Sequence, residues 1–163
     1  MKFDDASRSD MAINSIIKLA SFLQRALDKG RSNYIEMGEV SKYVNYMIRT
    51  NTHESLRYIE LMLENDRCKR IKRLRNDLFA LFNELLEHKA VYENLILPNG
   101  RIDRNKLALL IELDTNIIDA LKGLKNMLSV VKDRCEITLD EETEIRKLAS
   151  EIEKGIIKKK DII

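Results

Sequence analysis

The sequence predicts an all-α fold, a bundle of about five helices, and three observations indicate it. The composition favours helix, because the 163 residues include one proline, five glycines and no tryptophan. Apolar residues recur every three or four positions along most of the chain, which is the helical period, and no useful stretch alternates as a strand would. Two capping boxes, Asn33-x-x-Glu36 and Thr138-x-x-Glu141, mark helix starts. We expect a single helical domain covering residues 1–163.

The first predicted helix covers residues 10–28, and Gly30 is suited to end it. The second begins at Asn33 and ends in the polar stretch 50–52. Apolar spacing predicts one buried face for each helix. These faces are Ile13, Ile16, Ile17, Ala20, Leu23 and Leu27 in the first, and Met37, Val40, Val44, Met47 and Ile48 in the second.

The two longest predicted helices cover residues 53–93 and 104–132. The sequence Leu97-Pro98-Asn99-Gly100 separates them and is the strongest turn signal in the chain. Because both helices have apolar seams of the coiled-coil type, we expect them to pack antiparallel. The fifth helix begins at Thr138, and residues 158–163 are expected to fray. The seam of the fourth helix is Leu107, Leu110, Asp114, Ile117, Leu121, Leu124, Leu128 and Val131.

Charge and sequence pattern exclude several classes of protein. The net charge is +2, from 29 basic and 27 acidic residues, which does not indicate a polyanion-binding protein as a whole. No apolar run is long enough to span a bilayer, and the first residues lack a signal peptide, so we expect a cytoplasmic protein. Cys68 and Cys135 have no metal-binding spacing and are interpreted as reduced thiols, although the sequence does not exclude a disulfide.

An inventory of chemistry-bearing residues predicts no enzyme. His53 and His88 are the only histidines, and neither has a partner pattern around it. Both are interpreted as surface or helix-end residues. No nucleophile motif, glycine-rich phosphate loop or zinc motif is present, and neither histidine has a glutamate three residues before it. We therefore predict no catalytic residue, no metal site and no cofactor.

The strongest local anomaly is a basic cluster at residues 67–75. Six of its nine residues are basic: Arg67, Lys69, Arg70, Lys72, Arg73 and Arg75. Three interpretations stay open: a solvated face, a partner-facing patch or buried arginine–carboxylate network, and direct contact with nucleic acid. The last is weakened because no aromatic residue that could stack on bases lies within the cluster.

Asp114 interrupts an apolar seam. A buried carboxylate is costly unless it is paired. The sequence leaves two interpretations open, a residue at the boundary of the core and a buried ion pair. For the second, an arginine of the basic cluster is the candidate partner.

Several segments resemble GINS subunits, which form a replication complex of archaea and eukaryotes. The resemblance lies in Leu63-Glu64-Asn65-Asp66-Arg67-Cys68 with the arginine-rich helix after it, and then in Ile96-Leu97-Pro98-Asn99. The stretch Leu139-Asp140-Glu141-Glu142-Thr143-Glu144 is similar to the acidic helix starts of archaeal members. The chain departs from the family in one respect, because nothing between Cys135 and Ile163 resembles the small β-rich domain that these subunits usually add.

The resemblance implies a non-catalytic scaffold, a subunit that assembles with others and joins the MCM helicase to its partner protein. Long helices with two separate apolar stretches fit a chain that packs partly on itself and partly on a neighbour. The expected partners are therefore other protein subunits, in a homo- or hetero-oligomer. The alternative is a small helical nucleic-acid-binding subunit of an RNA-guided or viral nucleoprotein complex, which would contact phosphates through the basic cluster.

Overall fold

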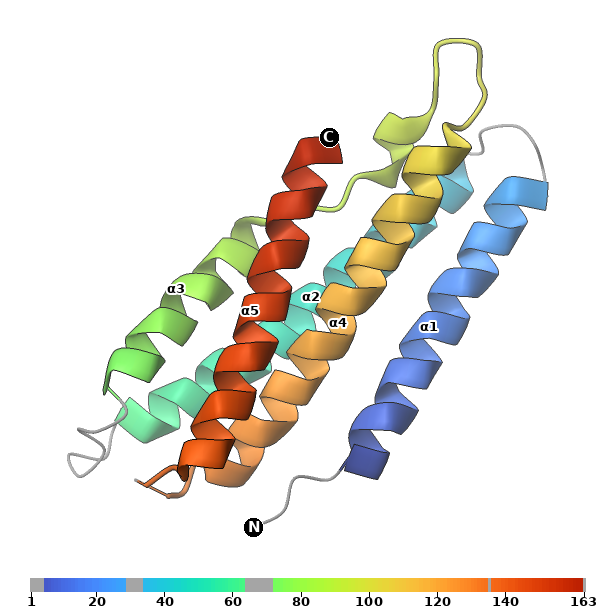
Figure 1. The fold of residues 1–163 in the computed structure, drawn as a ribbon. Helices are drawn as coiled ribbons and strands as arrows, with labels where there is room; N and C mark the ends of the chain where they lie inside the picture. The colour runs from blue at the N-terminus through green and yellow to red at the C-terminus, as the bar shows by residue number, and fades with distance from the viewer. Residues whose placement is uncertain (1–4, 29–33, 64–71, 135, 163) are drawn as a thin grey trace.

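The computed structural model of the chain describes residues 5–28, 34–63, 72–134 and 136–162. These residues form five α-helices and one short 3-10 helix, drawn in Figure 1, and the predicted all-α bundle is confirmed. In the part of the chain so described, the one β-type pairing is an isolated bridge between Ile96 and Ile102. The elements are α1 (Asp5–Asp28), α2 (Tyr34–Leu63), α3 (Lys72–Glu87), η2 (Tyr92–Leu95), α4 (Arg104–Val131) and α5 (Leu139–Ile162).

Helix α4 is the centre of the bundle. It packs along α5, α1 and α2, and Figure 1 shows it running antiparallel to α5. Every residue of its predicted apolar seam is buried, including Asp114. Helix α3 lies mainly against α2 and touches α5 at fewer points. No helix within the described ranges is both long enough and apolar enough to cross a membrane.

Two of the predicted local signals are confirmed, the cap at Thr138 and the turn after Pro98. At the start of α5, Thr138 Oγ1 accepts from the Glu141 amide, and the Glu141 carboxylate accepts from the Thr138 amide, both at 3.1 Å. In the predicted turn, Gly100 has a φ of 81° and its amide donates to the Leu97 carbonyl. Glycine suits this left-handed conformation because it has no Cβ. Asn33 and both cysteines lie outside the described residues.

The predicted boundary between the second and third helices is wrong. Helix α2 continues through residues 50–52 to Leu63 without a break. The polar side chains there turn back on their own helix, as Asn51 donates to the Met47 carbonyl and Thr52 donates to the Ile48 carbonyl. Such bonds satisfy buried polar groups inside a helix, so this polar stretch does not end it.

The predicted helix 53–93 is also wrong, because its residues divide between α2 and α3 and the chain leaves helix after Glu87. The expected antiparallel packing across the Pro98 turn is corrected as well. Helix α3 lies beside α2 and α5 and does not pack on α4, whose antiparallel neighbours are α1 and α5.

Two further expectations need correction. The expected fraying of residues 158–163 does not occur as far as Ile162, because α5 extends to that residue and Lys159 is buried. The predicted buried face of α1 is wrong in part. Leu19 and Ala26 are buried, whereas Ile16, Ile17 and Ala20 are exposed. Leu23 of the predicted stripe packs against the core, and the side chains of Ile13 and Leu27 lie outside the part that the structure describes.

Candidate functional site

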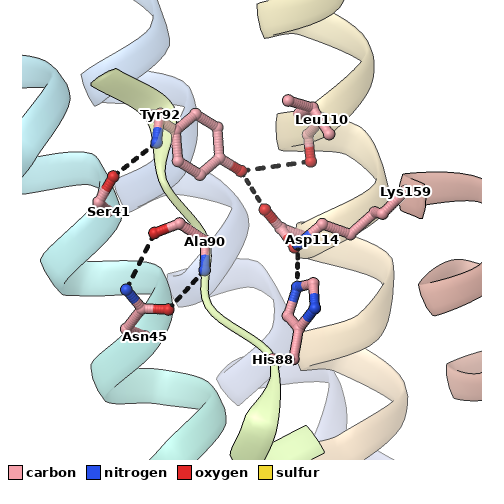
Figure 2. Close-up of polar contacts among 8 residues, drawn as sticks. All are labelled: Ser41, Asn45, His88, Ala90, Tyr92, Leu110, Asp114 and Lys159. Atoms are coloured by element: carbon pink, nitrogen blue, oxygen red, sulfur yellow. Dashed lines mark hydrogen bonds and ion pairs between the residues drawn. The ribbon is translucent and has the colours of Figure 1, made fainter. Parts of the chain in front are cut away.

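Helix α2 holds the chain segment that follows α3. The Asn45 side chain makes two hydrogen bonds to Ala90: Nδ2 donates to the carbonyl at 3.0 Å, and Oδ1 accepts from the amide at 2.8 Å. One turn earlier, Ser41 Oγ accepts from the Tyr92 amide at 2.7 Å. Residues 88–91 lie outside any helix, so these side chains supply partners that a helix would otherwise give. Figure 2 shows that Asn45 and Ser41 hold residues 88–92 between α2 and α4; we call these residues the clamped segment.

The clamped segment brings Tyr92 to Asp114 on α4. Both side chains are buried, and the Tyr92 hydroxyl donates to Asp114 Oδ2. The other carboxylate oxygen, Oδ1, accepts from Lys159 Nζ on α5. Lys159 and Asp114 are 1% and 0% exposed, so the two opposite charges pair away from the solvent-exposed surface. A buried carboxylate is tolerated under these conditions because both of its oxygens have donors.

His88 completes the network from the end of α3. Lys159 Nζ lies within hydrogen-bond distance of His88 Nε2. A lysine ammonium offers only donors, so Nε2 accepts and the ring proton is on Nδ1. Burial lowers the pKa of His88, and the charge of Lys159 lowers it further. The half-buried imidazole is therefore neutral near pH 7.

Tyr92 is kept as a phenol by the same environment. Burial raises its pKa well above 10.0, and the negative charge of Asp114 raises it further. The hydroxyl thus remains a donor at physiological pH. Because Asp114 and Lys159 are sealed from solvent, the network can position α4, α5 and the clamped segment, but a substrate has no access to its charges.

A cavity of about 430 Å³ lies beside this network, between α2 and the carboxyl end of α3. We call it the α2–α3 pocket. His88 lines it, so this residue joins the pocket to the buried ion pair. Three of the lining side chains are cations and none is a carboxylate. The lining residues are Lys42, Asn45, Tyr46, Ile48, Arg49, Leu85, Leu86, His88 and Lys89.

A second cavity, of about 380 Å³, lies between α3 and α5 and differs in charge. Its lining carries Asp77, Glu84 and Glu153 together with Arg146. Arg146 pairs with Asp77 across the groove at 3.3 Å. Mixed and mutually paired charges give this groove no single preference for an anion or a cation.

The residues predicted as an interface are only partly placed. Lys72 and Arg73 are exposed at the start of α3, and Arg75 is half-buried. The other members of the basic cluster, Arg67, Lys69 and Arg70, lie outside the described residues. Asp114 is buried and ion-paired, and its partner is Lys159 instead of an arginine of the cluster.

Sequence reasoning missed Lys159, although a signal for it exists. Lys159 follows Ile152 and Ile156 at helical spacing on the buried side of α5, opposite the acid in the seam of α4. His88 follows the last residue of α3, in agreement with the helix-end interpretation, but its contact with Lys159 was not foreseen. The cations of the α2–α3 pocket gave no signal, because they are dispersed among the solvent-facing residues of α2 and the segment after α3.

Across the described ranges, no group of three or more histidine, cysteine, aspartate or glutamate side chains is arranged to hold a metal ion. No family model matches the chain, and neither does any curated protein or solved structure. The resemblance to GINS subunits therefore stays a prediction.

Proposed function

We propose that the chain is a non-catalytic cytoplasmic subunit of a multiprotein assembly, and that α1 carries part of the contact surface for a partner subunit. The observation that supports this is the exposure of Ile16 and Ile17, at 47% and 60%. Ala20, one turn further along, is exposed as well. An apolar stripe at this spacing is what one helix buries against another helix, so the occupant we propose is a helix of the partner subunit.

The other exposed apolar side chains do not form such a stripe. In the described ranges, none of these large side chains has a second exposed large apolar residue directly beside it in the sequence, although Ala80 and Ala108 adjoin Phe79 and Leu109. Single exposed apolar residues are normal on protein surfaces. Ile16 and Ile17 differ because they are adjacent, so their exposed apolar areas add up at one place on the surface. The single residues are Tyr46, Leu61, Phe79, Val91, Leu97, Leu109, Leu139 and Ile157.

The most specific form of the proposal is a GINS-like DNA replication scaffold that links the replicative helicase to its partners. It rests on the resemblance of the segments around Leu63, Ile96 and Leu139 to GINS subunits. The long α4 with neighbours on three sides is compatible with a rigid scaffold.

Site-specific photo-crosslinking in the native cells tests the proposal. A photoreactive amino acid in place of Ile17 is expected to crosslink one partner, whereas the same amino acid in place of the singly exposed Leu139 is not. Mass spectrometry then identifies the partner: a GINS-type or MCM protein supports the replication scaffold, and a second copy of this chain indicates self-assembly.

A matched charge substitution provides the control. Ile17→Glu is expected to release the partner from the purified assembly, and Leu139→Glu to retain it, with both variants folded by circular dichroism. A wild-type chain that elutes from native extract as a monomer by size exclusion with light scattering, and gives no crosslink from Ile17, would contradict the assembly proposal.

The alternative function is nucleic-acid binding through the basic cluster, and the exposure of Lys72 and Arg73 favours keeping it. Cations that contact phosphates release counterions, so the affinity would fall steeply with salt. The test is binding of a single-stranded oligonucleotide by the wild type and by Arg73→Glu at two salt concentrations. Binding without salt dependence, or without loss in Arg73→Glu, would contradict this alternative.

A further inference from the structure

We propose that the α2–α3 pocket binds a nucleoside phosphate, with the phosphate held by Lys42, Arg49 and Lys89 and the base stacked on Tyr46. This is a binding site in addition to the proposed assembly surface, and it lies on other elements. Four features of the pocket carry the inference: its charge, the absence of pairing for its cations, the placement of the aromatic ring and the fixed position of its walls.

The charge of the pocket is of one sign. Lys42, Arg49 and Lys89 line it, and no carboxylate does. Among the described residues, no acidic side chain forms an ion pair with any of the three. The pocket thus concentrates unneutralised positive charge, which an anion would neutralise.

The helix geometry places two of the three cations on one face of α2. Residues 42, 45, 46 and 49 lie at helical spacing on one face of α2, so Lys42 and Arg49 flank Tyr46 over two turns, about 10 Å. Lys89 approaches from the opposite wall, after α3. An arginine fork contacts two phosphate oxygens at once, and two lysines supply further point charges.

The carboxyl end of α3 explains only part of this charge. A helix dipole favours a cation near its carboxyl end, and one such residue satisfies it. The last turn of α3 itself contains no basic residue, and Lys89, which follows the helix, is placed to fulfil this role. Lys42 and Arg49 lie on another helix, α2, so the dipole of α3 does not require them.

Tyr46 and the apolar floor are suited to a base. Tyr46 is 58% exposed, although its ring is large and apolar, and Ile48 and Leu85 beneath the pocket are buried. Stacking a base on an aromatic side chain contributes about 1–3 kcal/mol. The volume of about 430 Å³ lies within the range typical of small-molecule sites.

The two walls of the pocket are already fixed relative to each other. Asn45, between Lys42 and Tyr46, holds Ala90 through two hydrogen bonds, and Ala90 directly follows Lys89. His88 is held from the other side by Lys159. Figure 2 shows both attachments. A preorganised site spends less binding energy on ordering its side chains and backbone.

Calorimetric titration of the full chain at low salt tests the proposal with three probes: ADP, inorganic pyrophosphate and adenosine. ADP is expected to bind most tightly, pyrophosphate more weakly because it lacks the base, and adenosine weakest because it lacks the phosphates. Arg49→Glu is expected to weaken ADP and pyrophosphate by about tenfold or more. Tyr46→Ala is expected to weaken ADP and leave pyrophosphate unchanged.

Lys147→Glu, the same kind of charge change at an exposed position of α5, serves as the control and should retain the affinity of the wild type. Because Arg49 and Tyr46 are exposed, their variants are expected to fold, and circular dichroism checks this. The proposal is overturned if ADP does not bind, or if its affinity is the same in Arg49→Glu and in the wild type. Tight binding of a single-stranded oligonucleotide without binding of ADP would also overturn it, in favour of a nucleic-acid surface.

Discussion

Asp114 and Lys159 place a negative and a positive charge in the buried part of the contact between α4 and α5. Taking either charge out of water is costly, and the attraction between them offsets that cost only while both are present. Tyr92 and His88 supply the remaining hydrogen bonds of the pair. The network therefore specifies how α4, α5 and the clamped segment align, more than it adds to overall stability.

Removing one partner of this ion pair should lower the free energy of unfolding far more than removing both partners. Lys159→Met leaves the Asp114 carboxylate buried with only Tyr92 as donor, and we expect it to lower the free energy of unfolding by about 3–5 kcal/mol. The double variant Asp114→Leu with Lys159→Met should be more stable than either single variant. Urea unfolding at pH 7 measures all three. Additive losses would show that the two charges do not interact.

His88 should make stability depend on pH below neutrality. Its folded pKa is lowered from 6.5, first by burial and then by Lys159, so the unfolded chain binds the proton more readily. Stability is then fully present above pH 6.5, falls as the pH drops below this value, and levels off once the pH is below the folded pKa.

The variant His88→Gln removes this titration while keeping an acceptor for Lys159. The stability of the wild type relative to His88→Gln is therefore expected to fall as the pH decreases from 7 to 5, measured by urea unfolding. His53→Gln, a substitution of the exposed histidine on α2, is the control. Parallel pH profiles for the wild type and His88→Gln would contradict the expectation.

At the scale of elements, close approach determines how α4 and α5 meet. Gly155 of α5 is buried against Ile117 of α4. A Cβ at Gly155 would lie 2.6 Å from Ile117 Cγ1, closer than a Cβ packs in proteins, and 3.0 Å from Ile117 Cδ1, which is also tight. The glycine therefore sets the spacing that lets Lys159, one turn later, reach Asp114.

Two glycine substitutions should have opposite effects. Gly155→Ala is expected to lower the free energy of unfolding by about 1–3 kcal/mol, because overpacking outweighs the better helix propensity of alanine. Gly38→Ala is the matched control in α2, where the nearest atom, Glu93 Oε1, would lie 3.8 Å from the new Cβ. This variant should gain up to about 1 kcal/mol. Thermal and urea unfolding measure both, and a gain in Gly155→Ala would refute the close-approach argument.

Two helix boundaries could not be predicted from the local sequence. The stretch 50–52 was expected to end a helix, yet in α2 its side chains bond to carbonyls one turn back. Conversely, α3 ends at Glu87 within a segment predicted as helix to residue 93. The partners that make this ending favourable, Ser41 and Asn45, lie about 50 residues away in sequence. Spacing within a segment cannot report partners at that separation.

At the scale of the molecule, α4 should be the most stable element and α1 the least. Helix α4 has neighbours along three sides, whereas α1 packs mainly on α4 and leaves Ile16 and Ile17 in solvent. In native-state hydrogen exchange, amides in the middle of α4 should exchange only on global unfolding, and those around Ile17 through smaller openings. Equal protection in the two helices would contradict this order. Binding of a partner to α1 is expected to slow hydrogen exchange of the α1 amides and to leave that of the α4 amides unchanged.

The sequence by itself determined the helical class, the α4 seam, the Pro98 turn and the cap at Thr138, because each depends on residues within a few positions of one another. It also identified Asp114 as the anomaly of its seam. Only the tertiary structure decided that Lys159 is the partner of Asp114, that α5 and not α3 packs along α4, and that three dispersed cations line one pocket. These facts depend on contacts between distant segments, whose packing energy overrides local spacing.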